Sequence, residues 1–244
     1  MRAPPRHMPV YAANTTRALR SPGDTLKRLL NPEQRSLFLL LSVLAFFVLT
    51  PLLEGNPTGE LFIILVMYLT LISATAELHE KRALFRSAIP IAATSMVLLG
   101  ATHFYPIRPL MLADDIVLAG FLCLVSVSLF LYLGQPGAVT KGRLYVSVAL
   151  YLLIGLSWFV LYQIVDLLQP GSFAEAGATL TGKILPTKLL YFSLVSLTTL
   201  GYGDILAIRP AARITAALEA VAGVLYIAIT VARLVAGYQT SNKK

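Results

Sequence analysis

Long apolar stretches alternate with short polar segments along most of this chain. Each of six stretches is rich in Leu, Val, Ile, Ala and Phe and carries few charges. A helix needs about 20 apolar residues to cross the hydrocarbon core of a bilayer. The stretches are Ser36–Leu53, Leu61–Ala76, Ala88–Phe104, Leu112–Leu133, Leu144–Leu168 and Ala212–Ala236. The pattern predicts six transmembrane helices, of which the second and third extend by a turn into the membrane interfaces.

A further apolar segment, Pro186–Leu200, lies between the fifth and sixth stretches. It is too short to cross a bilayer, so we expect a helix that dips into the membrane and is followed by non-helical backbone. Pro186 suits the first turn of that helix, where a missing N–H costs nothing. Non-helical backbone is tolerated at membrane depth only where protein or a water-filled path surrounds it. The segment therefore predicts a loop that lines such a path.

Residues 198–204 read Thr-Thr-Leu-Gly-Tyr-Gly-Asp. A strip of small residues there can turn its backbone carbonyls inward. With the Thr199 hydroxyl, these carbonyls can replace the water shell of a dehydrated cation. Gly201 and Gly203 supply backbone angles that residues with a Cβ resist. Tyr202 can point away from the path and pack behind the strip.

This string resembles the selectivity filter of the potassium-channel superfamily, which reads Thr-Val-Gly-Tyr-Gly. Here Leu200 replaces the Val and keeps an apolar side chain behind the filter. The resemblance implies a K⁺-binding filter completed by Gly203, with the ions held at Thr199, Leu200, Gly201 and Tyr202. The predicted fold class is then an all-α membrane protein with six transmembrane helices plus a re-entrant pore helix and a selectivity-filter loop.

The chain contains one filter string, and one string cannot surround an ion. A potassium filter is built from four such loops, so the resemblance implies a homotetramer in a lipid bilayer. It implies no cofactor other than K⁺ ions in the filter.

Two residues near the filter are candidates for its support. Asp204 follows the filter at its outer mouth, where it can bond to a side chain of the pore helix. Val195 stands where some bacterial members of the superfamily place a carboxylate partner, so that partner is missing here. Tyr191 matches a Trp position of many relatives and can donate its hydroxyl instead. The alternative for Asp204 is a solvated loop carboxylate.

The last apolar stretch contains Ala222-Gly223-Val224-Leu225, which resembles the inner helix of voltage-gated potassium channels. The resemblance makes Gly223 a candidate gating hinge, since Gly lowers helix stability by about 1 kcal/mol relative to Ala. Close helix packing explains a Gly equally well. The Pro-Val-Pro kink of many voltage-gated relatives is absent, and residues 230–232 read Thr-Val-Ala instead.

Glu219 and Arg233 are ionisable residues inside the same predicted span. Such residues are costly in a membrane and are often functional. Glu219 precedes Gly223 by one turn, so we expect it to support the pore helix and filter through Ser196 or Thr198. Arg233 lies near the end of the span, where its side chain can reach the interface.

The predicted elements divide the chain into three parts. Residues 1–35 form a basic cytoplasmic N-terminal segment, in which Thr25–Leu30 can make a short interfacial helix. Residues 36–140 form a peripheral four-helix unit, which a Gly- and Pro-containing break at 134–137 separates from the rest. Residues 141–244 form the pore domain of outer helix, pore helix, filter and inner helix.

The peripheral unit resembles a voltage-sensor domain in its placement but lacks gating charges. A sensor helix carries regularly spaced Arg or Lys, which supply about 3–4 gating charges per subunit. The fourth span, from Met111 to Leu133, contains neither residue, and Asp114 and Asp115 lie near its start. Arg108 precedes it in an outer loop. We therefore expect no gating by a charged sensor helix and assign the unit as a scaffold or as a receptor for lipid or another regulator.

Composition and charge agree with a membrane protein. The chain has 244 residues, 57% of them hydrophobic, and a mean hydropathy of +0.74. Its net charge of +8 is explained better by the distribution of basic residues across a membrane than by binding to nucleic acid. Basic residues concentrate in the leader, in the loops near 81–86 and 141–143, and at the C-terminus. That side should be cytoplasmic, so we expect a multi-pass protein of the cell (plasma or inner) membrane with both termini inside.

No segment suggests an enzyme. Cys123 is the one cysteine, so no disulfide framework exists. His103 is isolated in the sequence, and Glu77, His79 and Glu80 are better suited to pairing with nearby basic residues than to binding metal. We therefore predict passive, potassium-selective conduction. Two alternatives stay open: a weakly selective cation channel, and a non-conducting regulatory or scaffold subunit.

Overall fold

The computed structural model of the chain describes residues 31–78, 82–135, 140–180 and 185–241. The basic leader up to residue 30, with the expected interfacial helix at Thr25–Leu30, lies outside these residues, as do His79 and Glu80. Six long helices are α2 (Pro32–Leu53), α3 (Pro57–Glu77), α4 (Arg82–Phe104), α5 (Arg108–Leu133), α6 (Lys141–Leu168) and α8 (Pro210–Ser241). All six are long and apolar enough to cross a membrane, which confirms the predicted spans and the all-α membrane fold.

Each long helix begins before its apolar stretch does. Polar residues fit a first helical turn at the membrane interface, and Pro fits the N-terminal positions of a helix because its missing N–H is not needed there. Pro occupies such a position in α2, α3 and α5. At the start of α2, the Gln34 side chain accepts a hydrogen bond from the Asn31 N–H at 3.0 Å. Hydrophobic periodicity alone therefore placed the helix starts too late.

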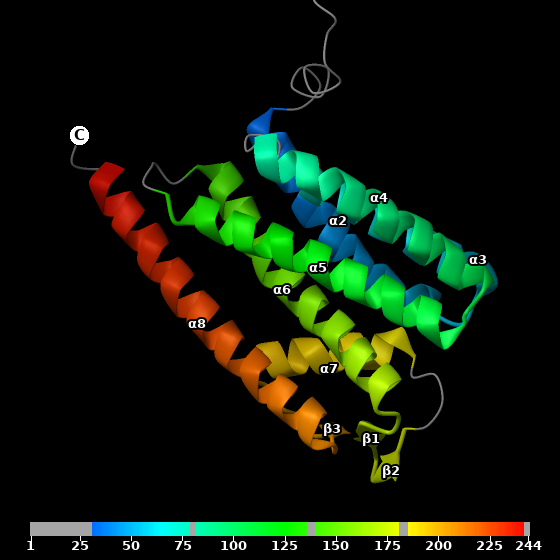
Figure 1. The fold of residues 1–244 in the computed structure, drawn as a ribbon. Coiled ribbons are helices and arrows are strands. Elements are labelled where there is room, and N and C mark those ends of the chain that lie inside the picture. The colour runs from blue at the N-terminus through cyan, green and yellow to red at the C-terminus, as the bar shows by residue number, and fades with distance from the viewer. Residues whose placement is uncertain (1–30, 79–81, 136–139, 181–184, 242–244) are drawn as a thin grey trace, which may run out of the picture.

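Helices α2 to α6 pack against one another as a bundle (Figure 1). Each contacts the next along the chain, and α6 also packs along α2. The side chains that fill this arrangement include the fully buried Leu39, Leu71, Phe121 and Leu150. Helix α6 thus touches both ends of the peripheral unit and also the re-entrant helix. The division of the chain near residue 140 stays a prediction.

The short helix α7 (Pro186–Leu197) crosses between α6 and α8 (Figure 1). Its N-cap is Leu185, and Pro186 is at its start as expected. Leu189, Leu190 and Leu197 are buried against the neighbouring helices. The apolar face of a helix too short to span a membrane is thereby covered by protein, which is the condition under which a re-entrant helix is stable.

A small antiparallel sheet joins the two ends of the re-entrant segment, and sequence analysis missed it. Strand β1 (Phe173–Glu175) lies between β2 (Ala178–Thr179) and β3 (Ile205–Ala207). Ala176 and Gly177 both have positive φ, at 48° and 81°, as a two-residue hairpin turn requires. Strands of two or three residues show no periodic pattern, so nothing in the sequence signalled them.

The start of α5 corrects one expectation about the peripheral unit. Arg108 is the first residue of the helix and not part of a preceding loop. Its guanidinium donates a hydrogen bond to the carbonyl of Leu167 near the end of α6. From Arg108 onward α5 contains no other Arg or Lys. Asp114 and Asp115 are both buried, and the Thr102 hydroxyl of α4 donates to Asp114 at 3.4 Å.

Candidate ion-conduction site

Helix α7 ends directly at the filter string. Its C-cap is Thr198, whose N–H donates to the Leu194 carbonyl at 3.1 Å. The last carbonyls of a helix carry the negative end of its dipole, which favours a cation nearby. At the opposite end, Glu54 at the end of α2 accepts a hydrogen bond from the Thr187 N–H at 3.1 Å. A carboxylate there complements the positive end of the dipole, and sequence analysis did not identify it.

The backbone of residues 199–203 has a positive φ at every second residue. Thr199, Gly201 and Gly203 have φ values of 58°, 57° and 77°, and Leu200 and Tyr202 between them are not in the positive-φ region. Alternation of right- and left-handed residues turns successive peptide groups in the same direction. Thr199 is β-branched, and a positive φ is a genuine outlier for such a residue. Backbone strain of this kind is characteristic of functional sites.

Hydrogen bonds hold the amide side of the filter against α7. The Val195 carbonyl accepts from the N–H groups of Leu200 at 2.9 Å and Gly201 at 3.4 Å, and the Ser196 carbonyl accepts from Thr199 at 2.9 Å. Within the described parts of the chain, no donor bonds to the carbonyls of residues 199–203. The N–H groups of Thr199, Leu200 and Gly201 are therefore bonded to the pore helix, whereas the carbonyl oxygens of residues 199–203 are available to a ligand.

Two large side chains of the filter are uncovered in the single chain. Leu200 is 55% exposed and Tyr202 is 67% exposed. Helix α8 likewise exposes much of its apolar surface, at Ile214, Leu218, Val221 and Leu225 among others. Apolar surface of this extent needs lipid or another protein chain to cover it.

Asp204 is fixed at the outer end of the filter by two kinds of contact. The Tyr191 hydroxyl donates to Asp204 Oδ2 at 2.8 Å, which is the contact expected from the sequence. This hydrogen bond lowers the pKa of Asp204 and raises the pKa of Tyr191 to about 12. The Asp204 carbonyl also accepts from the Ala176 N–H at 3.4 Å, and β3 follows directly. The role of Asp204 and Tyr191 in supporting the filter stays a prediction.

Glu219 lies behind the pore helix and is fully buried. The expected partners were Ser196 or Thr198, but the carboxyl group contacts Ser193 and Tyr162 instead. Ser193 Oγ is 2.5 Å from Glu219 Oε1, and the Tyr162 hydroxyl donates to Oε2. Ser193 is one turn before the expected Ser196 on the same face of α7, so the helix was predicted correctly but not the depth at which α8 lies along it, which depends on packing.

Gly223 of α8 packs tightly against the last turn of the pore helix. A Cβ at this position would lie 2.1 Å from the carbonyl oxygen of Leu197 and 3.1 Å from its Cδ1. Helix α8 continues without interruption through Gly223. Close packing therefore explains the glycine, whereas its role as a gating hinge stays a prediction.

Arg233 contacts the peripheral unit. Its guanidinium lies 4.7 Å from the ring centroid of Phe130 and donates to the Phe130 carbonyl at 3.5 Å, near the C-terminal end of α5. A cation near the last carbonyls of a helix is favourable. The expectation that Arg233 simply reaches the interface omitted this contact, which only the meeting of α5 and α8 creates.

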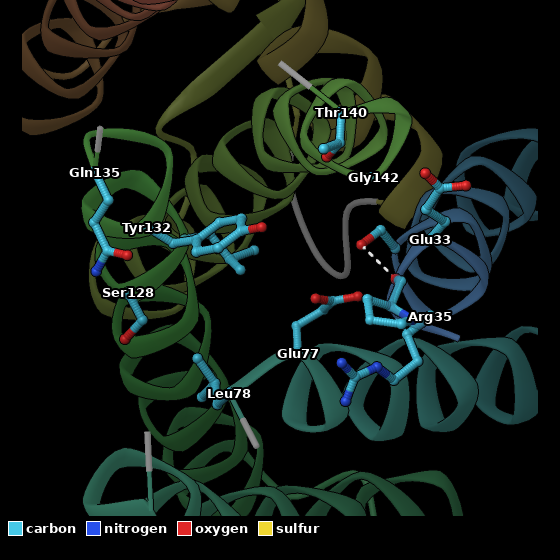
Figure 2. Close-up of a pocket in the computed structure, with 12 residues that line it drawn as sticks. Glu33, Arg35, Glu77, Leu78, Ser128, Tyr132, Gln135, Thr140 and Gly142 are labelled. Atoms are coloured by element: carbon cyan, nitrogen blue, oxygen red, sulfur yellow. Dashed lines mark hydrogen bonds between the residues drawn. The ribbon is translucent and has the colours of Figure 1, made fainter. Parts of the chain in front are cut away.

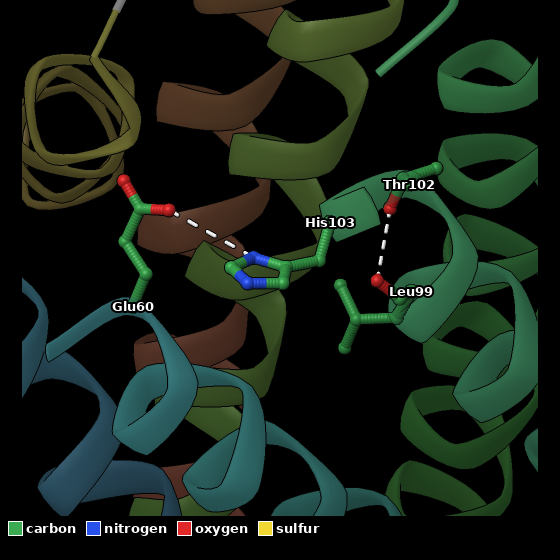
Figure 3. Close-up of polar contacts among 4 residues, drawn as sticks. All are labelled: Glu60, Leu99, Thr102 and His103. Carbon is green, nitrogen blue, oxygen red and sulfur yellow. Dashed lines mark hydrogen bonds and ion pairs between the residues drawn. The ribbon is translucent and has the colours of Figure 1, made fainter. Parts of the chain in front are cut away.

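Other polar clusters lie away from the filter. His103 Nδ1 of α4 is 3.8 Å from Glu60 Oε2 of α3, so His103 has a partner (Figure 3). A cavity of about 250 Å³ lies between the first turns of α2 and α6 and the last turns of α3 and α5, with Glu33, Glu77 and Tyr132 in its lining (Figure 2). In the described residues no group of three His, Cys, Asp or Glu side chains could hold a metal ion.

Comparison with known proteins adds one finding. Residues 148–239 match a family model described as an ion channel. The match runs from α6 through the pore helix and filter into α8, and it supports ion conduction as the function of this part of the chain. No curated protein and no solved structure matches the chain.

Proposed function

We propose that this protein is a potassium-selective ion channel. The observation that carries the proposal is the backbone at residues 199–203, where φ alternates in sign and the carbonyl oxygens have no donor within the described chain. A cation that sheds its water shell needs such a row of oxygens. The ion-channel match over residues 148–239 supports conduction, and the Thr-Leu-Gly-Tyr-Gly string supports K⁺ as the ion.

In this proposal four copies of the chain surround one pore. Each copy brings one filter strand and one α7, whose C-terminal end directs its dipole toward the ions. Neighbouring copies cover Leu200, Tyr202 and part of α8, which a single chain leaves exposed. K⁺ binds at Thr199, Leu200, Gly201 and Tyr202, and conduction is passive and needs no cofactor.

The orientation and the role of the peripheral unit belong to the same proposal. The filter opens to the outside and both termini are cytoplasmic, because the basic loops concentrate on the side opposite the filter. The protein belongs to the cell membrane. The peripheral helices α2 to α5 act as a scaffold or as a receptor for lipid or another regulator, and not as a charged voltage sensor.

Ion selectivity of the purified protein tests the proposal. In planar bilayers under a K⁺/Na⁺ gradient, we expect reversal potentials near the K⁺ equilibrium value, and Rb⁺ should permeate almost as well as K⁺. Native mass spectrometry in mild detergent should show four subunits. Gly201→Val should abolish the current while the oligomer persists, since its φ of 57° is unsuitable for a β-branched residue.

Two outcomes would overturn it in favour of the alternatives. Equal permeability to K⁺ and Na⁺ would indicate a weakly selective cation channel. Absence of current in a well-folded oligomer, with current restored by a co-purifying chain, would indicate a regulatory subunit.

A further inference from the structure

Three helices meet at one carboxyl group inside the predicted membrane region. Glu219 of α8 is 0% exposed. Ser193 Oγ of the pore helix α7 lies 2.5 Å from Glu219 Oε1, and the same Oγ lies 2.7 Å from the Gly155 carbonyl oxygen of α6. The Tyr162 hydroxyl of α6 donates to Glu219 Oε2. A continuous row of contacts therefore runs from Gly155 through Ser193 and Glu219 to Tyr162.

The number of hydrogen atoms available along this row indicates the protonation state of the Glu219 carboxyl group. The three contacts need three hydrogen atoms, but the hydroxyls of Ser193 and Tyr162 supply only two, because a hydroxyl carries one donor hydrogen. The Gly155 carbonyl can only accept, so the Ser193 hydrogen belongs to that contact. The contact of Ser193 Oγ with Glu219 Oε1 then needs a hydrogen from Oε1. One Ser193 hydrogen shared between both acceptors would give two weaker bonds, whereas a protonated carboxylic acid supplies the third hydrogen and makes all three contacts full hydrogen bonds.

The surroundings of Glu219 offer no charge that would hold an ionised carboxylate. Helix α6 presents the hydroxyls of Tyr151 and Tyr162, helix α7 presents Ser193, and strand β3 has no titratable side chain. On α8 itself, the Arg213 guanidinium is bound to the Ala207 carbonyl. Within the described residues no Lys, Arg or His forms an ion pair with Glu219. An unpaired buried charge is strongly unfavourable, whereas a hydrogen-bonded neutral acid is not.

We propose that Glu219 is a neutral carboxylic acid that positions the pore helix by donating a hydrogen bond to Ser193. The aromatic packing around it fits a fixed geometry, since Tyr162, Phe173 and Phe192 have ring centroids 5.0–5.6 Å apart. The acid links α8 to α7, and Ser193 links α7 to α6, two residues before Val195, whose carbonyl holds Leu200 and Gly201 of the filter. Removal of the proton leaves Ser193 with one hydrogen for two acceptors, so it can bond fully either to Gly155 of α6 or to Glu219 of α8 but not to both, and it places a charge behind the filter.

This inference rests on the proposed channel function only in its effect on conduction, because the protonation state can be measured without ion flow. The first experiment is infrared spectroscopy of the purified protein in lipid bilayers at neutral pH. A protonated carboxyl group gives a carbonyl band that shifts in deuterated water. We expect Glu219→Gln to remove part of this band and Glu60→Gln, at an exposed position, to leave it unchanged. An unchanged band in Glu219→Gln would overturn the proposal.

The second experiment compares substitutions of Glu219 by K⁺ flux from liposomes. Gln has the shape of the neutral acid, with an NH₂ group that donates to Ser193 and an oxygen that accepts from Tyr162. We expect Glu219→Gln to retain most of the flux that Glu219→Ala loses, with the Ala variant lower by roughly tenfold, as loss of buried hydrogen bonds predicts.

The pH profile separates positioning from a general need for a polar residue. Flux through the unmodified channel should fall as the pH rises far enough to remove the Glu219 proton, whereas Glu219→Gln, which cannot ionise, should lose that alkaline limb. A Gln variant as impaired as Ala, or an unchanged alkaline limb, would contradict the proposal. Absence of flux in the unmodified protein would instead refute channel function, and the infrared result would still decide the state of Glu219.

Discussion

Gly223 faces a backbone atom that cannot move aside. An added Cβ would lie 2.1 Å from the Leu197 carbonyl oxygen, at the last turn of the pore helix. We expect Gly223→Ala to separate α8 from α7 and to lower K⁺ flux, because overpacking costs roughly 1–3 kcal/mol. This outweighs the gain of about 1 kcal/mol that Ala brings to a helix. The melting temperature of the purified oligomer should fall by several degrees.

Gly120 of α5 is the matched control, because a Cβ there would meet nothing within 4 Å. Gly120→Ala should leave the melting temperature unchanged or raise it slightly. Equal stability and flux in both variants would show that α8 does not approach α7 as closely as described, and would favour the hinge interpretation of Gly223 over close packing.

The hydrogen bond from Tyr191 to Asp204 predicts how the filter responds to external acid. This hydrogen bond lowers the pKa of Asp204. The stability that the bond gives to the folded state is therefore fully present above the ordinary carboxyl pKa, and it is lost as the pH falls through the lowered pKa. Tyr191→Phe should raise the pKa of Asp204, so the fall of K⁺ flux at acidic pH should begin at a higher pH. Tyr105→Phe, at an exposed position in the turn after α4, should leave this fall in place. If flux falls at the same acidic pH in the unmodified protein, in Tyr191→Phe and in Tyr105→Phe, this contact does not support the filter.

At the scale of elements, the pore helix depends on the peripheral unit for its N-terminal end. The Glu54 carboxylate of α2 accepts from the Thr187 N–H at 3.1 Å, where α7 begins. A negative charge at a helix N-terminus is worth about 0.3–1 kcal/mol. Glu54→Gln should therefore lower the melting temperature slightly and the K⁺ flux with it. Glu33→Gln, in the first turn of α2 and so at the opposite end of this helix from Glu54, is the control. A larger effect of the control would mean that α2 does not cap the pore helix.

At the scale of the whole molecule, the distribution of charge on α5 predicts weak voltage dependence. Moving one elementary charge across the full field is worth about 2.3 kcal/mol per 100 mV, and steep gating adds several such charges per subunit. The single cation of α5 is Arg108, at its first residue and bound to the end of α6. Asp114 and Asp115 are buried against neighbouring helices. Conductance–voltage curves at symmetrical K⁺ should be shallow.

An effective gating charge of several units that disappears in Asp114→Asn with Asp115→Asn, but survives substitutions in the filter, would make α5 a voltage sensor of inverted sign. Weak rectification that arises from ions moving in the filter is compatible with the prediction.

The sequence by itself determined the membrane class, the six crossing segments, the short re-entrant helix and the position of the filter string. These features depend on local properties: the length of an apolar run, the conformational freedom of glycine and the preference of Pro for helix starts. The pairing of Tyr191 with Asp204 was accessible as well, because the resemblance to potassium-channel filters places a hydrogen-bond donor at the position of Tyr191.

Only the tertiary structure decided how separate helices meet. Four contacts each join elements that are far apart in the chain. They are the hydrogen bonds of Glu219, the close approach at Gly223, the contact of Arg233 with Phe130 and the cap that Glu54 provides. Their existence depends on the rotation of each helix about its axis and on its depth against its neighbours. Packing of side chains sets both quantities, and hydrophobic periodicity in one segment carries no information about the face that another segment presents.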